Sequence, residues 1–119
     1  TTFFLGKPKY APYKELKNKG VHIAIATDYN PGSCSIQSMP FIIMLSCIYL
    51  HMNILEAIKS STYVAAKSLM MENEIGSIEK GKKADILIWN LSRVEEIPYT
   101  IDSQQLNLIL KNGKSIFTA

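Results

Sequence analysis

One apolar run limits the folds open to this chain more than any other feature. Residues 21–27, VHIAIAT, are nearly continuously apolar and are followed at once by Asp28 and an Asn-Pro-Gly turn. Such runs, rich in β-branched residues, are typical of strands covered on both faces, as in parallel α/β sheets. The segment before it, PYKELKNKG, has the pattern of a short amphipathic helix that ends at Gly20. A helix, a glycine and a buried strand in this order predict an α/β fold.

Two further helices are expected after the turn. Residues 39–50 are almost entirely apolar, with Ser35 or Ser38 as a helix cap. Because a membrane-spanning helix needs roughly 20 apolar residues, this stretch predicts a buried helix instead. Residues 54–69 carry apolar and small side chains at helical spacing, with Asn53 as the cap.

The sequence pattern changes from helical to β-prone near residue 73. Residues 86–89 are expected to form a strand, and two β-rich arms flank Asn112 and Gly113 near the end. Asn-Gly is the dipeptide that best tolerates the positive φ angles of a type I′ hairpin turn. We therefore expect two parts, residues 1–73 and residues 74–119.

Composition indicates a folded globular chain. The 119 residues are 47% hydrophobic and 19% charged, enough for one small domain or a piece of a larger one, and the first residue is Thr, which favours a processed chain or a fragment. The net charge of +3 comes largely from lysines near the start, which we interpret as a solvated helix face, with no nucleic-acid motif. Two cysteines without a CxxC spacing, and no visible signal peptide, favour a reducing, cytoplasmic setting and no membrane partner.

Asp28 is the first candidate site residue. Side chains alternate along a strand, so His22, Ala24, Ala26 and Asp28 share one face. In a (β/α) barrel Asp28 would sit at the carboxyl-terminal rim, where such folds place their chemistry. The alternative is an Asp that only begins a turn. His22 lies about 20 Å away along a strand, too far to share an ion with Asp28, because metal ligands lie at about 2 Å.

The loop after Asp28 carries a second set of candidates. Asn30 offers an amide, Gly32 an accessible backbone and Ser33 a hydroxyl, which together suit a polar ligand. Asn-Pro-Gly is equally common turn chemistry, so both interpretations stay open. Cys34 has no neighbouring histidine or basic residue and is not expected to be a nucleophile. The chain has no HxH pair, so it cannot build a complete zinc site by itself.

Three stretches carry a resemblance to a known family. IATDYNPGSC, the run from SMPF to AAKSL, and IGSIEKGKKADILIWN closely resemble the C-terminal part of the imidazolonepropionase family, within the amidohydrolase superfamily. EEIPYTI and the terminal LKNG are also similar, so the resemblance covers nearly the whole chain. The Asp-x-Asn-Pro-Gly element is fairly specific for this family, whereas the Gly-Ser-Ile to Ala-Asp pattern recurs throughout the amidohydrolases.

The resemblance implies the C-terminal part of a metal-dependent-hydrolase (β/α)8 barrel that carries one zinc or iron ion, plus strands of a small composite β-sandwich. Residues 1–73 would be the last β/α units of the barrel, and residues 74–119 the sandwich part. Asp28 would be both metal ligand and catalytic residue. Asn30 and Gly32 would contact the ring-opened product, and Ser33 the substrate. The remaining metal ligands, histidines from earlier strands, have no counterpart in this chain.

The implied activity is a step of histidine degradation, hydrolysis of 4-imidazolone-5-propanoate to N-formimidoyl-L-glutamate, in a cytoplasmic homodimer. This small molecule would be its partner, and the chain alone is expected to be inactive without the upstream barrel. Two alternatives stay open. One is another cyclic-amide amidohydrolase, and the other is a non-catalytic association module, because exposed strand edges favour oligomerisation.

Overall fold

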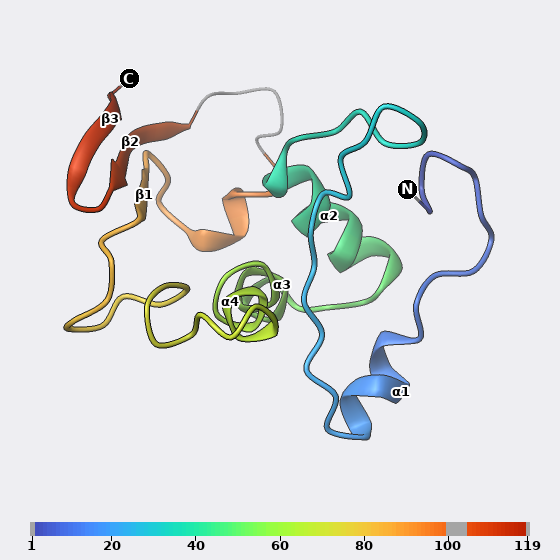
Figure 1. Ribbon diagram of the computed structural model, residues 1–119. Helices are drawn as coiled ribbons and strands as arrows, with labels where there is room; N and C mark the ends of the chain where they lie inside the picture. Colours follow the sequence, from blue (N-terminus) through green and yellow to red (C-terminus); the bar gives the residue numbers. More distant parts are fainter. Residues whose placement is uncertain (1, 100–104, 119) are drawn as a thin grey trace.

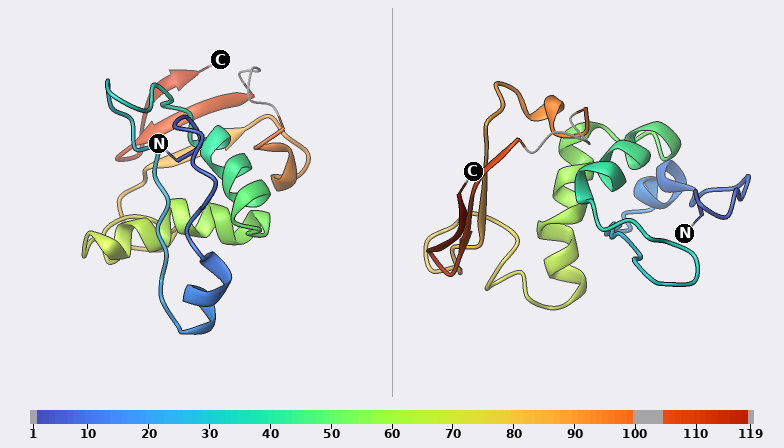
Figure 2. Two further views of the ribbon diagram at one scale, coloured as in Figure 1. Left: turned by 90° about the vertical axis from the view of Figure 1, so that its right-hand side faces the viewer. Right: turned by 90° about the horizontal axis from the view of Figure 1, so that it is seen from above.

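The computed structural model describes residues 2–99 and 105–118. Its elements, in chain order, are α1 (Tyr13–Asn18), α2 (Met39–Tyr49), α3 (Ile54–Ser61), α4 (Tyr63–Ser68), β1 (Ile86–Trp89), the 3-10 helix η1 (Val94–Glu96), β2 (Leu106–Lys111) and β3 (Lys114–Thr118). The sheet lies at one end of the molecule, and α1 with the N-terminal segment lies at the other (Figure 1). Seen from above, α2, α3 and α4 lie between these two ends (Figure 2).

The expected helix starts are confirmed by their caps. Ser38 Oγ accepts a hydrogen bond from the amide of Phe41 over 3.3 Å at the start of α2. Asn53 and Glu56 form a capping box at the start of α3, with bonds of 2.8 and 3.0 Å. These side chains satisfy amides that have no partner within the first turn of a helix.

The helical region expected over residues 54–69 is confirmed, but it forms two helices instead of one continuous helix. It divides at Thr62, whose φ of −121° and ψ of −91° are not helical, so that α3 ends at Ser61 and α4 begins at Tyr63. The Thr62 hydroxyl donates to the carbonyl of Ile58 over 2.8 Å. Hydroxyl bonds to a carbonyl four residues back favour bends in a helix, which explains a break that hydrophobic spacing does not reveal.

The expected strand at residues 21–27 is not formed either. The segment is extended and its side chains alternate as predicted: Ile23 and Ile25 pack against the core, whereas His22, Ala24 and Ala26 are exposed. Two of its amides bond to helices: that of Val21 donates to the carbonyl of Leu16 over 3.1 Å, and that of Ile25 donates to the carbonyl of Ser60 over 3.2 Å. A strand requires a neighbouring strand for its ladder, and the described residues place none beside this segment.

The core lies where this segment meets the helices. Its buried cluster consists of Tyr13 of α1, Ile43 of α2, Met52 between α2 and α3, and Ala57 of α3. Gly20, with a φ of 76°, ends the helical turn after α1 and directs the chain into the extended segment, as predicted. The core therefore fixes the path of the segment that leads to Asp28.

The sheet is antiparallel, in the order β1-β2-β3. The strand expected at residues 86–89 is confirmed as β1. The hairpin is confirmed too, because Asn112 and Gly113 have φ angles of 50° and 76°, both positive as a type I′ turn requires. The boundary near residue 73 stays a prediction. None of the described helices is long and apolar enough to cross a membrane.

Candidate active-site loop

Asp28 begins a loop that projects beyond α2 (cyan, Figure 1). Its side chain is exposed, on the same face of the extended segment as His22, Ala24 and Ala26. Its φ of 53° lies in the left-handed region, which a residue other than glycine adopts at a cost. The carboxylate is thus presented where the extended chain ends, as the sequence predicts.

Asn30 organises the loop through its side chain. Asn30 Oδ1 accepts hydrogen bonds from the amide of Gly32 at 3.0 Å, the amide of Ser33 at 2.8 Å and the hydroxyl of Ser33 at 3.1 Å. Asn30 Nδ2 donates to the carbonyl of Asp28 at 2.7 Å. The loop therefore brings all four predicted site residues together, with the Asn30 carboxamide turned into the loop.

Cys34 closes the loop, a role that the sequence did not reveal. Its carbonyl accepts from the Asn30 amide at 2.8 Å, and its own amide donates back to Asn30 at 3.3 Å. The side chain is 3% exposed, and Sγ lies 3.2 Å from the carbonyl of Thr27, to which the thiol donates. An Asn followed by Gly and Ser at positions two and three was the available signal for the Asx-type turn; no pattern marked the cysteine.

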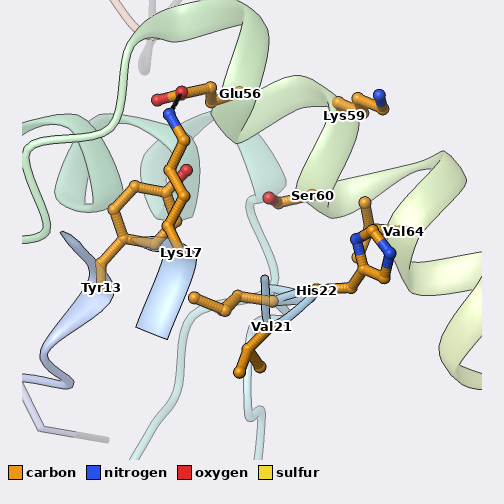
Figure 3. Close-up of a pocket in the computed structure, with 9 residues that line it drawn as sticks. Tyr13, Lys17, Val21, His22, Glu56, Lys59, Ser60 and Val64 are labelled. Carbon is orange, nitrogen blue, oxygen red and sulfur yellow. Dashed lines mark hydrogen bonds and ion pairs between the residues drawn. The ribbon is translucent and has the colours of Figure 1, made fainter. Parts of the chain in front are cut away.

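A cavity of about 250 Å³ lies at the opposite end of the extended segment (Figure 3). Nine residues from α1, α3, α4 and the segment line it: Tyr13, Lys17, Val21, His22, Ile23, Glu56, Lys59, Ser60 and Val64. His22 belongs to this cavity and not to the Asp28 loop, which agrees with the separation expected from strand geometry. The cavity therefore lies outside the predicted site.

An ion pair between Lys17 and Glu56 joins α1 to α3 at the rim of this cavity (Figure 3). The Lys17 ammonium and the Asn53 amide hold the pKa of Glu56 below its ordinary value. Burial and the nearby Glu56 carboxylate raise the pKa of Tyr13. The ion pair of Lys17 and Glu56 thus holds α1 against α3, which is a structural role.

Asp28 fits one position in a metal site. A carboxylate oxygen is a ligand that zinc and iron accept, and its exposure leaves it accessible to an ion. Among residues 2–99 and 105–118, no three His, Cys, Asp or Glu side chains gather closely enough to hold a metal ion. The donor set within the described residues is therefore partial.

The chain belongs to the amidohydrolase family, whose sequence profile matches residues 5–116. It is 40% identical over 116 residues to an imidazolonepropionase from Alkaliphilus oremlandii, which covers 98% of this chain and 28% of the relative. The chain thus spans between a quarter and a third of that relative's length.

Solved structures show the same fold. One is an adenosine deaminase from Xanthomonas campestris with bound zinc, with a TM-score of 0.82 and 22% identity, covering 98% of this chain and 30% of that one. An amidohydrolase from Thermotoga maritima matches with a TM-score of 0.69 and 25% identity, over 90% of this chain and 26% of that one. The expected fold class is confirmed at the level of this hydrolase barrel family.

Proposed function

We propose that this chain is the C-terminal portion of an imidazolonepropionase. Joined to the upstream part of its barrel, it would hydrolyse 4-imidazolone-5-propanoate to N-formimidoyl-L-glutamate, a step of histidine degradation. The observation that carries this proposal is the Asp28 loop at the end of an extended segment, in a chain 40% identical to an enzyme of that name. The zinc-containing structural relative supports metal dependence.

Asp28 would be the metal ligand that this chain contributes, and the other ligands would come from the upstream barrel. When bound, a zinc or iron ion would lower the pKa of a water molecule and polarise the substrate carbonyl. The Asp28 carboxylate accepts the proton of the attacking water. It then returns this proton to the ring nitrogen as the C–N bond breaks, which is general acid–base catalysis.

The loop would hold the substrate beside this carboxylate. As the resemblance implies, Asn30 and Gly32 would lie against the ring-opened product and Ser33 against the substrate. The hydrogen bonds within the loop support these contacts, because they keep Asn30, Gly32 and Ser33 next to Asp28. The complete enzyme would act on this small molecule as a cytoplasmic homodimer.

A chimera tests the proposal. The chain replaces the matched 28% of the Alkaliphilus oremlandii relative, and the chimera is loaded with zinc or with iron. We expect loss of imidazolonepropanoate and appearance of N-formimidoyl-L-glutamate, detected by mass spectrometry. A folded, metal-loaded chimera that does not form this product but hydrolyses dihydroorotate or another cyclic amide would favour the second amidohydrolase interpretation.

A further inference from the structure

The conformation of Asp28 requires support from its neighbours. A left-handed backbone at a residue other than glycine costs about 1–3 kcal/mol and persists only where the surroundings determine it. Asn30 Nδ2 supplies such support, because it donates a hydrogen bond to the Asp28 carbonyl over 2.7 Å. Asn30 therefore restrains the backbone that carries the carboxylate.

The side-chain oxygen of Asn30 has no free capacity to accept a further hydrogen bond. A carbonyl oxygen offers two lone pairs, and Asn30 Oδ1 already takes three donors, from Gly32 and Ser33. A ligand that donated to Asn30 Oδ1 would have to displace one of them. Displacement would release the turn that keeps Gly32 and Ser33 beside Asp28.

Cys34 restrains the other end of the loop. Its backbone exchanges two hydrogen bonds with Asn30, and its buried thiol donates to the carbonyl of Thr27, the residue before Asp28. Asp28 thus lies between two restrained carbonyls, its own and that of Thr27. Both restraints come from the seven residues after Thr27 and need no other part of a barrel.

From these contacts we infer that Asn30 and Cys34 are positioning residues, which arrange the Asp28 loop before any metal or substrate binds. The expected effect of these residues on kcat rests on the proposed function, whereas their effect on the loop conformation does not. Asn30 acts through the Asp28 backbone and the Gly32 and Ser33 amides. Cys34 acts through the Thr27 carbonyl.

The loop itself is tested by NMR on the 119-residue chain without metal. Asn30→Ala removes both sets of bonds, whereas Asn30→Asp keeps the acceptor and loses the donor to Asp28. We expect Asn30→Ala to speed amide exchange at Gly32 and Ser33 by about tenfold, the loss of roughly one hydrogen bond. It should also remove the strong amide–Hα NOE that a positive φ gives Asp28.

The conservative variant separates the two roles of Asn30. Asn30→Asp should keep slow exchange at Gly32 and Ser33 but weaken the Asp28 NOE. Asn18→Ala is the matched control, because Asn18 is exposed at the end of α1 and should change neither signal. A folded Asn30→Ala chain with unchanged exchange and an unchanged NOE would overturn the inference, whatever the activity of the complete enzyme.

Cys34 has its own pair of variants. Cys34→Ser keeps a donor to the Thr27 carbonyl, and Cys34→Ala does not. We expect the Asp28 NOE to survive the first and weaken in the second, and equal signals from both folded variants would exclude this role. If Cys34→Ala fails to fold, Cys34→Ser is compared with the unchanged chain. The serine hydroxyl should replace the thiol as donor to the Thr27 carbonyl, so loss of the Asp28 NOE in Cys34→Ser would contradict the role of Cys34.

Kinetics in the chimera give a second test. A positioning role predicts that Asn30→Asp lowers kcat by tenfold or more with KM changed less than threefold. A contact between the Asn30 carboxamide and the substrate predicts mainly a rise in KM, which would contradict the positioning role in catalysis. If the chimera shows no turnover, the proposed function fails. The NMR experiments on the 119-residue chain still test the loop inference independently.

Discussion

The amide of Asn112 donates a hydrogen bond to Asp85 Oδ1 over 2.9 Å, which fastens the turn between β2 and β3 to the residue before β1. Lys111 Nζ lies 2.5 Å from the other oxygen of Asp85, and the Gly113 amide donates to the carbonyl of Ala84 at 2.9 Å. The Lys111 ammonium and the Asn112 amide lower the pKa of Asp85. The Ala-Asp pair in the sequence thus has a structural role.

Replacement of Asp85 should loosen this hairpin in two steps. Asp85→Asn keeps an oxygen for the Asn112 amide but loses the charge opposite Lys111, whereas Asp85→Ala loses both. We expect the Tm to fall in the order unchanged chain, Asn, Ala, with faster amide exchange at Asn112 only in the Ala variant. Glu15→Ala, on the exposed face of α1, is the control. Equal exchange at Asn112 in all variants would disprove the role.

Gly76 should tolerate no side chain. A Cβ there would lie 2.7 Å from Ala66 Cβ and 3.0 Å from the carbonyl of Thr62, and the φ of 91° is unfavourable for other residues. We expect Gly76→Ala to lower the free energy of unfolding by about 1–3 kcal/mol in urea titrations. Gly81→Ala has a similar φ of 93° with nothing within 4 Å, so it should cost less. Equal costs would mean that packing at Gly76 is unimportant.

The ion pair of Glu56 makes stability depend on pH. Its pKa is lowered, chiefly by the hydrogen bond from Lys17 and then by the Asn53 amide, from an ordinary value of 4.5. The unfolded chain therefore takes up this proton at a higher pH than the folded chain does. The contribution is fully present above pH 4.5 and is lost as pH falls through the lower, folded value.

Unfolding measured between pH 7 and pH 3 tests this. Glu56→Gln should remove part of the acid-induced loss of stability, and Lys17→Met should reduce it for the same reason. Glu15→Gln, on the exposed face of α1, is the matched control. A Glu56→Gln variant with the full acid-induced loss would show that other carboxylates determine it.

Asp28→Ala in the chimera should abolish turnover and weaken metal retention while the fold survives. The side chain is exposed, so its removal leaves no buried cavity. Activity is measured by product formation, metal by elemental analysis after dialysis, and folding by circular dichroism. Turnover at the unchanged level would refute the catalytic role of Asp28.

The chain alone should self-associate. Residues 21–27 are extended, and of their described amides only those of Val21 and Ile25 donate to a backbone carbonyl. Such unpaired edges are templates for strand pairing with another chain. We expect an oligomer by light scattering, and its conversion to a smaller species when the upstream part of the relative is added. A stable monomer with no such exchange would contradict this expectation.

Much of the local structure could be predicted from the sequence. The caps at Ser38 and Asn53 depend on side chains within three residues of the amides they bind, and the turn at Asn112 depends on the φ angles that Asn and Gly tolerate. The presence of Asp28 at the end of an extended segment follows from alternation and a Pro-Gly turn in the same way. Short-range hydrogen bonds and φ preferences carry this information, and the sequence contains both partners.

The sequence by itself determined the helix starts, the hairpin and the grouping of the candidate site residues in one loop. Only the tertiary structure decided that residues 21–27 have no partner strand among the described residues, that the helix breaks at Thr62, and that Lys17 meets Glu56, 39 positions away. Strand pairing and helix contacts join residues far apart in the chain, so their outcome depends on which surfaces are present to pack. The local backbone preferences of residues 21–27 favour an extended conformation, but a strand also requires a neighbouring strand to pair with.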